Sequence, residues 1–236
     1  MDQKVAIVTG ASRGIGLEVV RQLAKQGITV ILTCRDSQKG EQVVNQLSQE
    51  GINAYFHPLD VASNESCEQF SQALQQSIKR VDILINNAGI FLEGNDPSLS
   101  ILDLPHENFL NTLETNTFGA IRLVKALRPI FSADGQIINV SSTMGQLEKM
   151  DSGYAAYRMS KAALNVVTKV LADELKENTD ICVNSVHPGW IKTQMGGPNA
   201  PQSVQEGADT IVWLALGADG TNPTGKFFHN RQIIPW

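Results

Sequence analysis

Hydrophobic residues along this chain occur in short, nearly uninterrupted runs that alternate with longer stretches of mixed character. A run such as KVAIVT (4–9) is typical of a strand buried on both faces, because it is short and rich in β-branched residues. In the stretch 16–27, Val19 and Leu23 fall on one face at helical spacing, and Gly27 marks the end. The pattern therefore predicts strands alternating with amphipathic helices.

The whole chain continues this alternation. We expect strands at 4–9, 29–34, 54–61, 81–89, 135–142, 180–189 and 225–230. We expect helices at 16–27, 37–51, 63–80, 106–131, 153–177 and 203–216. Continuous apolar strands separated by helices predict an α/β protein with one doubly wound parallel sheet, covered by helices on both faces as in a Rossmann fold. We expect a single domain over residues 1–236, with ligands bound beyond the carboxyl ends of the strands.

Composition narrows the class of protein further. Of the 236 residues, 42% are hydrophobic and 18% are charged, which is ordinary for a globular protein. The net charge of −5 argues against nucleic acid or an anionic membrane as the partner, because such surfaces attract basic proteins. Three widely spaced cysteines and four scattered histidines give no metal-ligand spacing, so we expect no metal site. No apolar run approaches the ~20 residues that span a bilayer, and we expect a cytoplasmic protein.

A glycine-rich segment, TGASRGIG (9–16), joins the first expected strand to the first helix. Gly10, Gly14 and Gly16 suit a tight turn, a close backbone approach to a pyrophosphate and a helix N-terminus facing it. The spacing departs from G-x-G-x-x-G, and a tight turn alone would also need glycines. The strand–glycine–helix context favours dinucleotide binding.

The ends of the second and third strands carry residues suited to the rest of a dinucleotide. Arg35, after the second strand, and Arg13, in the glycine loop, favour NADP over NAD, because guanidinium groups bind a 2′-phosphate. Alternatively, Arg35 is a solvated loop residue and Asp36 caps the next helix. After the third strand, Asp60 and the backbone of Val61 suit the adenine, although a helix-capping turn would look the same.

Two of the three tyrosines lie in SGYAAYRMSKAAL (152–164). Tyr157 and Lys161 are four residues apart and share a helix face, whereas Tyr154 is four residues from Arg158. A phenol has a pKa near 10, and a neighbouring cation lowers that pKa toward the working range of an acid–base catalyst. An isolated pair of this kind is usually a solvated helix face, so the surrounding motifs decide its meaning.

Those motifs follow the expected strands. The strand before Tyr157 ends in VSS, so that Ser141 or Ser142 emerges where a ligand should lie, and Asn116 lies in the helix after NNAG (86–89). The series TGASRGIG, LDV, NNAG, Asn116, VSS, YRMSK and HPGWIKT resembles the short-chain dehydrogenase/reductase family, in order and over almost the whole chain. The stretch from HPGWIKT onward looks most like the carbonyl-reductase branch, which uses NADPH.

The resemblance implies a role for each matching residue. Tyr157 would be the general acid, Lys161 would lower its pKa and hold the nicotinamide ribose, and Ser142 would orient the carbonyl group. Asn116 would help to hold a water that relays protons to Lys161. The residues expected to bind NADP(H) are Gly10, Ser12, Arg13, Gly14, Ile15, Gly16, Arg35, Asp60, Val61, Asn87, Ala88, Gly89, Tyr157, Lys161, Pro188, Gly189, Ile191 and Thr193.

The function implied is NADPH-dependent reduction of a ketone or aldehyde, with a small carbonyl compound as the substrate. The alternative is an NADP(H)-binding sensor or scaffold without turnover, which would have no need of the Ser, Tyr, Lys and Asn set. Some carbonyl reductases carry a long insertion before the catalytic tyrosine that keeps them monomeric. This chain lacks it, so we expect a homo-oligomer, dimer or tetramer, built on the helices that contain Asn116 and Tyr157.

Overall fold

The protein folds around one sheet, seen in a computed structural model that describes residues 3–94, 96 and 98–236. Its strands are β1 (Val5–Val8), β2 (Thr29–Cys34), β3 (Ala54–Pro58), β4 (Val81–Asn86), β5 (Phe131–Val140), β6 (Cys182–Val186), β7 (Phe227–His229) and β8 (Gln232–Ile234). They lie in the order β3–β2–β1–β4–β5–β6–β7–β8, and every pair is parallel except β7 with β8. The predicted doubly wound parallel sheet is confirmed, with one antiparallel strand at its edge.

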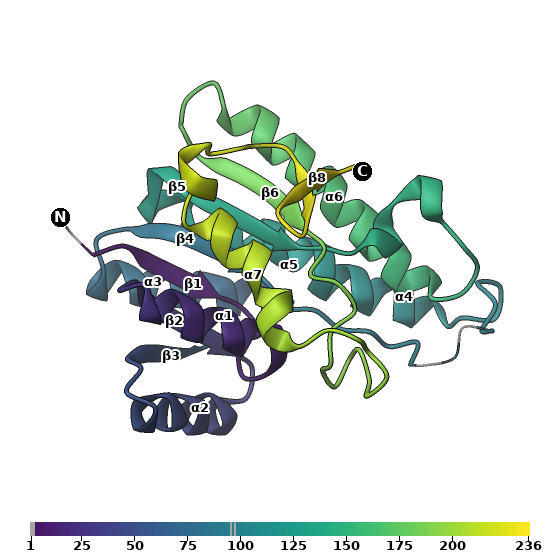
Figure 1. Cartoon of the computed structure of the whole chain (residues 1–236), viewed down its shortest axis with the longest axis horizontal. Helices are drawn as coiled ribbons and strands as arrows, with labels where there is room; N and C mark the ends of the chain where they lie inside the picture. Colours follow the sequence, from purple (N-terminus) through teal and green to yellow (C-terminus); the bar gives the residue numbers. More distant parts are fainter. Residues whose placement is uncertain (1–2, 95, 97) are drawn as a thin grey trace.

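Helices cover both faces of the sheet, as predicted. They are α1 (Gly14–Lys25), α2 (Ser37–Gln49), α3 (Asn64–Ser77), α4 (His106–Leu113), α5 (Gly119–Leu127), α6 (Ala155–Leu175) and α7 (Val204–Ala215). Alternate strand residues feed two cores: Ala6 and Val8 pack with α1, α2 and α7, whereas Ile7 packs with α3, α5 and α6. Figure 1 shows α1 and α7 side by side across one of these faces.

The largest departures from the expected elements are a divided helix and one additional strand. The helix predicted at 106–131 is divided by a π-helical turn (Glu114–Phe118) and ends in a 3₁₀ turn at 128–130, so that Phe131 already belongs to β5. Strand β8 was not predicted, because its three residues are too few to show a period. It follows a two-residue turn in which Asn230 and Arg231 both have positive φ, 49° and 58°, the geometry of a type I′ hairpin.

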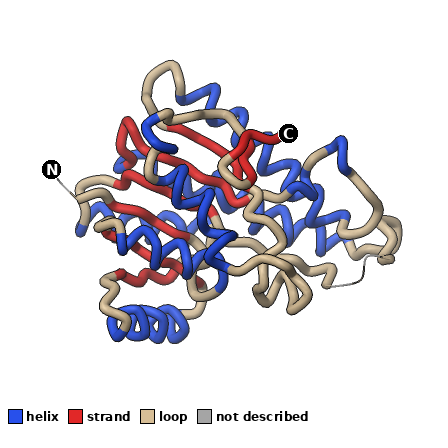
Figure 2. Tube along the Cα trace, viewed as in Figure 1, coloured by secondary structure: helices blue, strands red, loops and turns tan. Residues whose placement is uncertain are grey.

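The strand order places the chain's functional segments together. The connections from β1 lead to β2 on one side, while β4 pairs with β1 on the other side, which creates a crevice at the carboxyl ends. Figure 2 shows long loops gathered beyond one end of the strands. The motifs singled out in the sequence lie in these loops.

Candidate active site

A cavity of about 890 Å³ lies beyond the carboxyl ends of the strands. It is lined by the glycine loop, by the segments after β2, β3, β4 and β5, by the start of α6 and by the segment that follows β6. Every residue predicted to bind coenzyme or substrate lines it except Asn116. The volume is within the usual range for a ligand pocket.

The glycine loop brings a helix N-terminus to the cavity. Gly10 and Gly14 have φ of 62° and 59°, and a Cβ on Gly10 would lie 2.8 Å from the Cα of Ala88, so only glycine fits there. Helix α1 begins at Gly14, and the preceding Arg13 makes no side-chain capping bond to it within the described chain. The first N–H groups of α1 are therefore available to an anion such as a pyrophosphate.

Thr9 and Asn87 fix the glycine loop to the segment after β4. The Thr9 hydroxyl accepts hydrogen bonds from the backbone N–H groups of Asn87 (3.0 Å) and Ala88 (2.9 Å). The Asn87 amide in turn donates to the carbonyl oxygens of Thr9 (2.8 Å) and Gly10 (3.2 Å). The sequence pointed to Asn87 but not to Thr9, whose role depends on a contact with a distant segment.

Several positively charged side chains line the end of the cavity next to β2. Arg13, Arg35 and Lys39 line it, and both arginines are exposed. Asp36 caps α2 by accepting from the backbone N–H of Lys39 (3.1 Å), and its other oxygen lies 3.1 Å from the Lys39 ammonium. These bonds lower the pKa of Asp36. The capping role considered for Asp36 is confirmed, whereas Arg35 faces the cavity and suits a phosphate.

Tyr157, Lys161 and Ser142 meet at the other end. Lys161 donates from Nζ to the Val140 carbonyl oxygen (2.8 Å), and the same Nζ lies 5.5 Å from the centroid of the Tyr157 ring. Ser141 and Ser142 both line the cavity, but the Ser141 hydroxyl donates to Asn165 of α6 (2.7 Å). This geometry favours Ser142 over Ser141 as the serine that contacts a substrate.

The pKa of Tyr157 differs from the sequence-based expectation. Burial raises the pKa of the phenol to about 12, and a hydrogen bond with Ser142 partly offsets this rise. Burial also lowers the pKa of Lys161 to about 8. We expected the ammonium to lower the phenol pKa. Burial removes water from the phenol, which disfavours the charged phenolate, and this desolvation is the largest influence on the pKa of Tyr157.

Asn116 lies in the π-helical turn, just outside the cavity lining, and is almost fully buried. Its Oδ1 accepts from the Ile90 N–H (2.7 Å), and its Nδ2 donates to the Ile90 carbonyl oxygen (2.9 Å) and to Ser160 Oγ (3.0 Å). π-Helical turns are frequent at functional sites. The amide thus joins the segment after β4 to α6, and its part in a proton relay stays a prediction.

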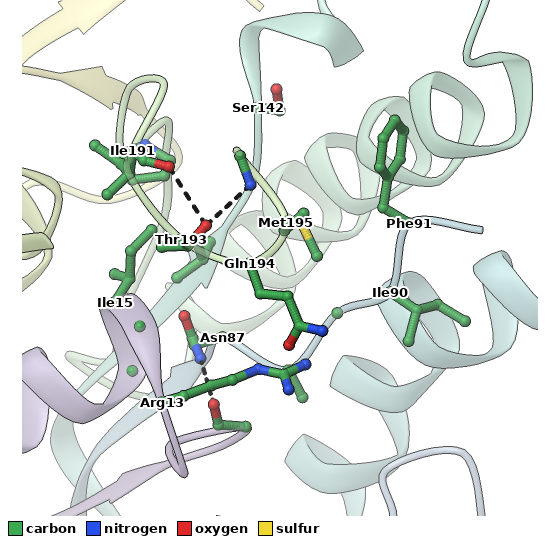
Figure 3. Close-up of a pocket in the computed structure, with 18 of the residues that line it drawn as sticks. Arg13, Ile15, Asn87, Ile90, Phe91, Ser142, Ile191, Thr193, Gln194 and Met195 are labelled. Carbon is green, nitrogen blue, oxygen red and sulfur yellow. Dashed lines mark hydrogen bonds between the residues drawn. The ribbon is translucent and has the colours of Figure 1, made fainter. Parts of the chain in front are cut away.

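The segment after β6 lines the side of the cavity opposite the glycine loop. The Thr193 hydroxyl donates to the Ile191 carbonyl oxygen (3.4 Å) and accepts from the Gly196 N–H (3.0 Å). The Thr193 methyl group would lie 3.3 Å from a Cβ on Gly14. Figure 3 shows Gln194 of this segment reaching toward Arg13 from the other side of the cavity.

Further residues at the site were given no functional role in the sequence analysis. Phe91 packs its ring against both Tyr154 (centroids 5.1 Å apart) and Tyr157 (5.0 Å). His187 lines the cavity, and burial lowers its pKa to about 4, so the ring is neutral at physiological pH. Its ring lies tilted against that of His229, with the ring centroids 4.7 Å apart.

Within residues 3–94, 96 and 98–236, no three His, Cys, Asp or Glu side chains are grouped so as to hold a metal ion. In the same part of the chain, none of the helices combines the length and apolar character needed to cross a membrane.

Comparison with known proteins agrees with this geometry. The model of the short chain dehydrogenase family matches residues 4–203. The chain belongs to the short chain dehydrogenase family.

Individual relatives point to one branch of that family. Carbonyl reductase [NADPH] 1 of Rattus norvegicus is 32% identical, and the alignment covers 100% of this chain and 99% of the rat protein. That alignment runs over 281 positions, so the rat protein contains segments that this chain lacks.

Two solved structures have folds similar to that of this chain. A putative short-chain dehydrogenase/reductase from Burkholderia multivorans with bound NADP has a TM-score of 0.87 at 26% identity, covering 99% of this chain and 100% of the other. The carbonyl reductase Sniffer of D. melanogaster has a TM-score of 0.85 at 29% identity, covering 99% of both chains.

Proposed function

We propose that the protein is an NADPH-dependent reductase of ketones or aldehydes in which Tyr157 is the general acid. The observation that carries this proposal is the convergence of Tyr157, Ser142 and Lys161 in one cavity with the glycine loop and the N-terminus of α1. The relatives named carbonyl reductase [NADPH] and the neighbour with bound NADP support it. We infer that the chain is one domain, since all its described strands join one sheet, and its cytoplasmic location stays a prediction.

The residues present fit NADP(H). The free N–H groups at the start of α1 suit the pyrophosphate, and Arg13 with Arg35 suits the 2′-phosphate. Ile191 and Thr193, across the cavity from Gly14, would hold the carboxamide end. When bound, the coenzyme supplies the hydride that reduces the carbonyl carbon.

The side chains of this protein would handle the oxygen of the substrate. Ser142 orients the carbonyl oxygen by a hydrogen bond, and Tyr157 gives that oxygen a proton as negative charge develops on it. A phenol with a pKa of about 12 is fully protonated at neutral pH, so the proton is present when the reaction begins. An alkoxide is a far stronger base than this phenolate, which makes the transfer favourable. Lys161 places a positive charge beside the ring and steadies the phenolate that remains.

The experiment is an initial-rate screen of NADPH against NADH over aromatic, aliphatic and quinone carbonyl compounds. We expect turnover with NADPH, and Tyr157→Phe should abolish it while NADPH binding is retained. Tyr55→Phe is the matched control, because Tyr55 is 63% exposed in β3 and is not part of the cavity lining. If the wild type binds NADPH but reduces no carbonyl compound, the sensor alternative replaces the enzyme.

We also propose that the protein is a homo-oligomer, dimer or tetramer, that pairs through α4, α5 and α6. Helices α4 and α6 pack together, the π-helical turn contacts all three helices, and this region exposes large apolar side chains. The exposed residues are Leu110, Phe118, Ile121, Met159, Val166 and Val170. An apolar surface of this kind is typical of a protein–protein contact.

A further inference from the structure

The helix that carries Tyr157 begins in an unusual way. Tyr154 occupies the N-cap position of α6 in the left-handed conformation, with φ of 56°, and makes no capping bond with its side chain in the described structure. A non-glycine residue with positive φ is uncommon and is held in place by its surroundings. The first N–H groups of the helix therefore need an acceptor from elsewhere.

Glu93 provides that acceptor from a segment far away in the sequence. Its Oε1 accepts from the Ala156 N–H (2.9 Å), and its Oε2 accepts from the N–H of Tyr157 itself (2.9 Å). The side chain is buried, with 7% of the residue exposed. Glu93 therefore binds the backbone of Tyr157, the residue proposed as the general acid.

The charge of Glu93 is balanced by the helix. No Lys or Arg of the described chain forms an ion pair with Glu93. A buried carboxylate is costly unless it is well bonded, and the positive N-terminus of a helix with two free N–H groups meets that need. The carboxylate and the first turn of α6 therefore stabilise each other, and neither is satisfied if the other moves.

The segment that carries Glu93 is also held through Ile90 and Phe91, which precede it in the chain. The backbone of Ile90 is held in both directions by the Asn116 amide, at 2.7 Å and 2.9 Å. The ring of Phe91 packs between Tyr154 and Tyr157, and Figure 3 shows it directed toward α6. The segment that carries Glu93 is therefore held by contacts other than the carboxylate, with the π-helical turn through Asn116 and with the start of α6 through Phe91.

We propose that Glu93 is a positioning residue for the reaction. Its bonds to Ala156 and Tyr157 fix the first turn of α6, and so fix the phenol of Tyr157 relative to Ser142 and Lys161. This proposal rests on the proposed function, because it assigns the phenol as the acid. It adds that the acid is placed by a carboxylate that is not part of the cavity lining.

Three variants separate the contributions of the two bonds. Glu93→Ala leaves both N–H groups without an acceptor, and we expect kcat to fall ~10²-fold, since a displacement of about 1 Å at a catalytic group costs this much. Glu93→Gln keeps the shape but sets an NH₂ donor against one of the N–H groups, so kcat should fall nearly as far. Glu93→Asp keeps the charge and one bond, and should recover part of the loss. The Kd of NADPH should change less than twofold in all three, because the glycine loop is untouched.

Glu206→Gln is the matched control. Glu206 also binds a helix N-terminus through its carboxylate, accepting from the Ser203 N–H (2.7 Å) at the start of α7, but it is exposed. The Glu206→Gln substitution should lower the melting temperature without lowering kcat. Amide hydrogen exchange of residues 155–158 is a second readout, and it should accelerate in Glu93→Ala only.

The outcomes distinguish the two proposals. If the wild type is active and Glu93→Ala keeps its kcat, or loses NADPH binding and kcat together, the role of Glu93 is overturned. If the wild type reduces no carbonyl compound while exchange of residues 155–158 still accelerates in Glu93→Ala, the proposed function fails, and the hold of Glu93 on Tyr157 remains. Unchanged exchange in an inactive protein would overturn both.

Discussion

The backbone of Gly145 packs directly on that of Lys161. A Cβ built on Gly145 would lie 2.6 Å from the carbonyl carbon of Lys161 and 2.7 Å from the N of Ala162. These are backbone atoms of α6, so they cannot rotate away as a side chain would. The turn that follows Ser142 is thereby held against the helix that carries the lysine.

We predict that Gly145→Ala separates these two segments. Overpacking a buried site costs ~1–3 kcal/mol, and the shift of Ser142 relative to Lys161 should lower kcat by ~10²-fold. Thermal unfolding and steady-state kinetics measure the two effects. Gly135→Ala is the control, because its Cβ would also clash, at 2.5 Å with Phe131, but in the middle of β5 and outside the cavity lining. It should lose stability and keep kcat; equal kcat losses in both variants would show a general effect of instability.

The pH dependence of the reaction should follow Lys161 rather than Tyr157. The pKa of Lys161 is about 8 and that of Tyr157 about 12, so the ammonium loses its proton first as pH rises. We expect kcat/KM for NADPH, which reports groups of the free enzyme, to be constant below pH ~8 and to fall tenfold per pH unit above it. His187 has a pKa of about 4, so it stays neutral near pH 7 and should cause no change in kcat/KM there.

Lys161→Arg tests this assignment, because a guanidinium stays charged over the whole range. The residual activity of this variant should lose the alkaline limb near pH 8. Should the limb remain at the same pH, another group controls it and the charge of Lys161 is not required in that step.

The preference for NADPH should depend on Arg35. Arg35 lines the cavity next to β2, and it takes no part in the ion pair between Asp36 and Lys39. A hydrogen bond to a charged group contributes ~1.5–3 kcal/mol, so Arg35→Ala should raise the KM of NADPH ~10–100-fold and leave that of NADH nearly unchanged. Arg128→Ala, an exposed arginine outside the cavity lining, removes the same charge and should alter neither KM. An equal rise for both coenzymes would place Arg35 elsewhere than at the 2′-phosphate.

Much of this site was predictable because its signals are local. The glycines of 9–16, and the spacing of Tyr157 and Lys161 on one helix, are visible in a few adjacent residues. Glu93 and Thr9 were missed because their partners are remote: Glu93 binds a helix 63 or 64 residues later in the chain. The raised pKa of Tyr157 was also missed, since sequence spacing shows a neighbouring charge but not the loss of water around the phenol.

The outer side of α4, α5 and α6 should be buried between two copies of the chain. Val166 and Val170 are 61% and 48% exposed on α6, where a solvent-facing helix would ordinarily carry polar residues. Val166→Glu places a charge on this surface without disturbing the core, and should weaken self-association by ~30-fold or more, the cost of losing one central contact of ~2 kcal/mol. Sedimentation equilibrium over a range of concentrations measures the change. Leu216→Glu, at the end of α7 and 45% exposed, is a matched substitution outside this surface and should leave the assembly intact. A wild type that sediments as a monomer at all concentrations, or a Val166→Glu variant that associates as strongly as the wild type, would contradict an interface on these helices.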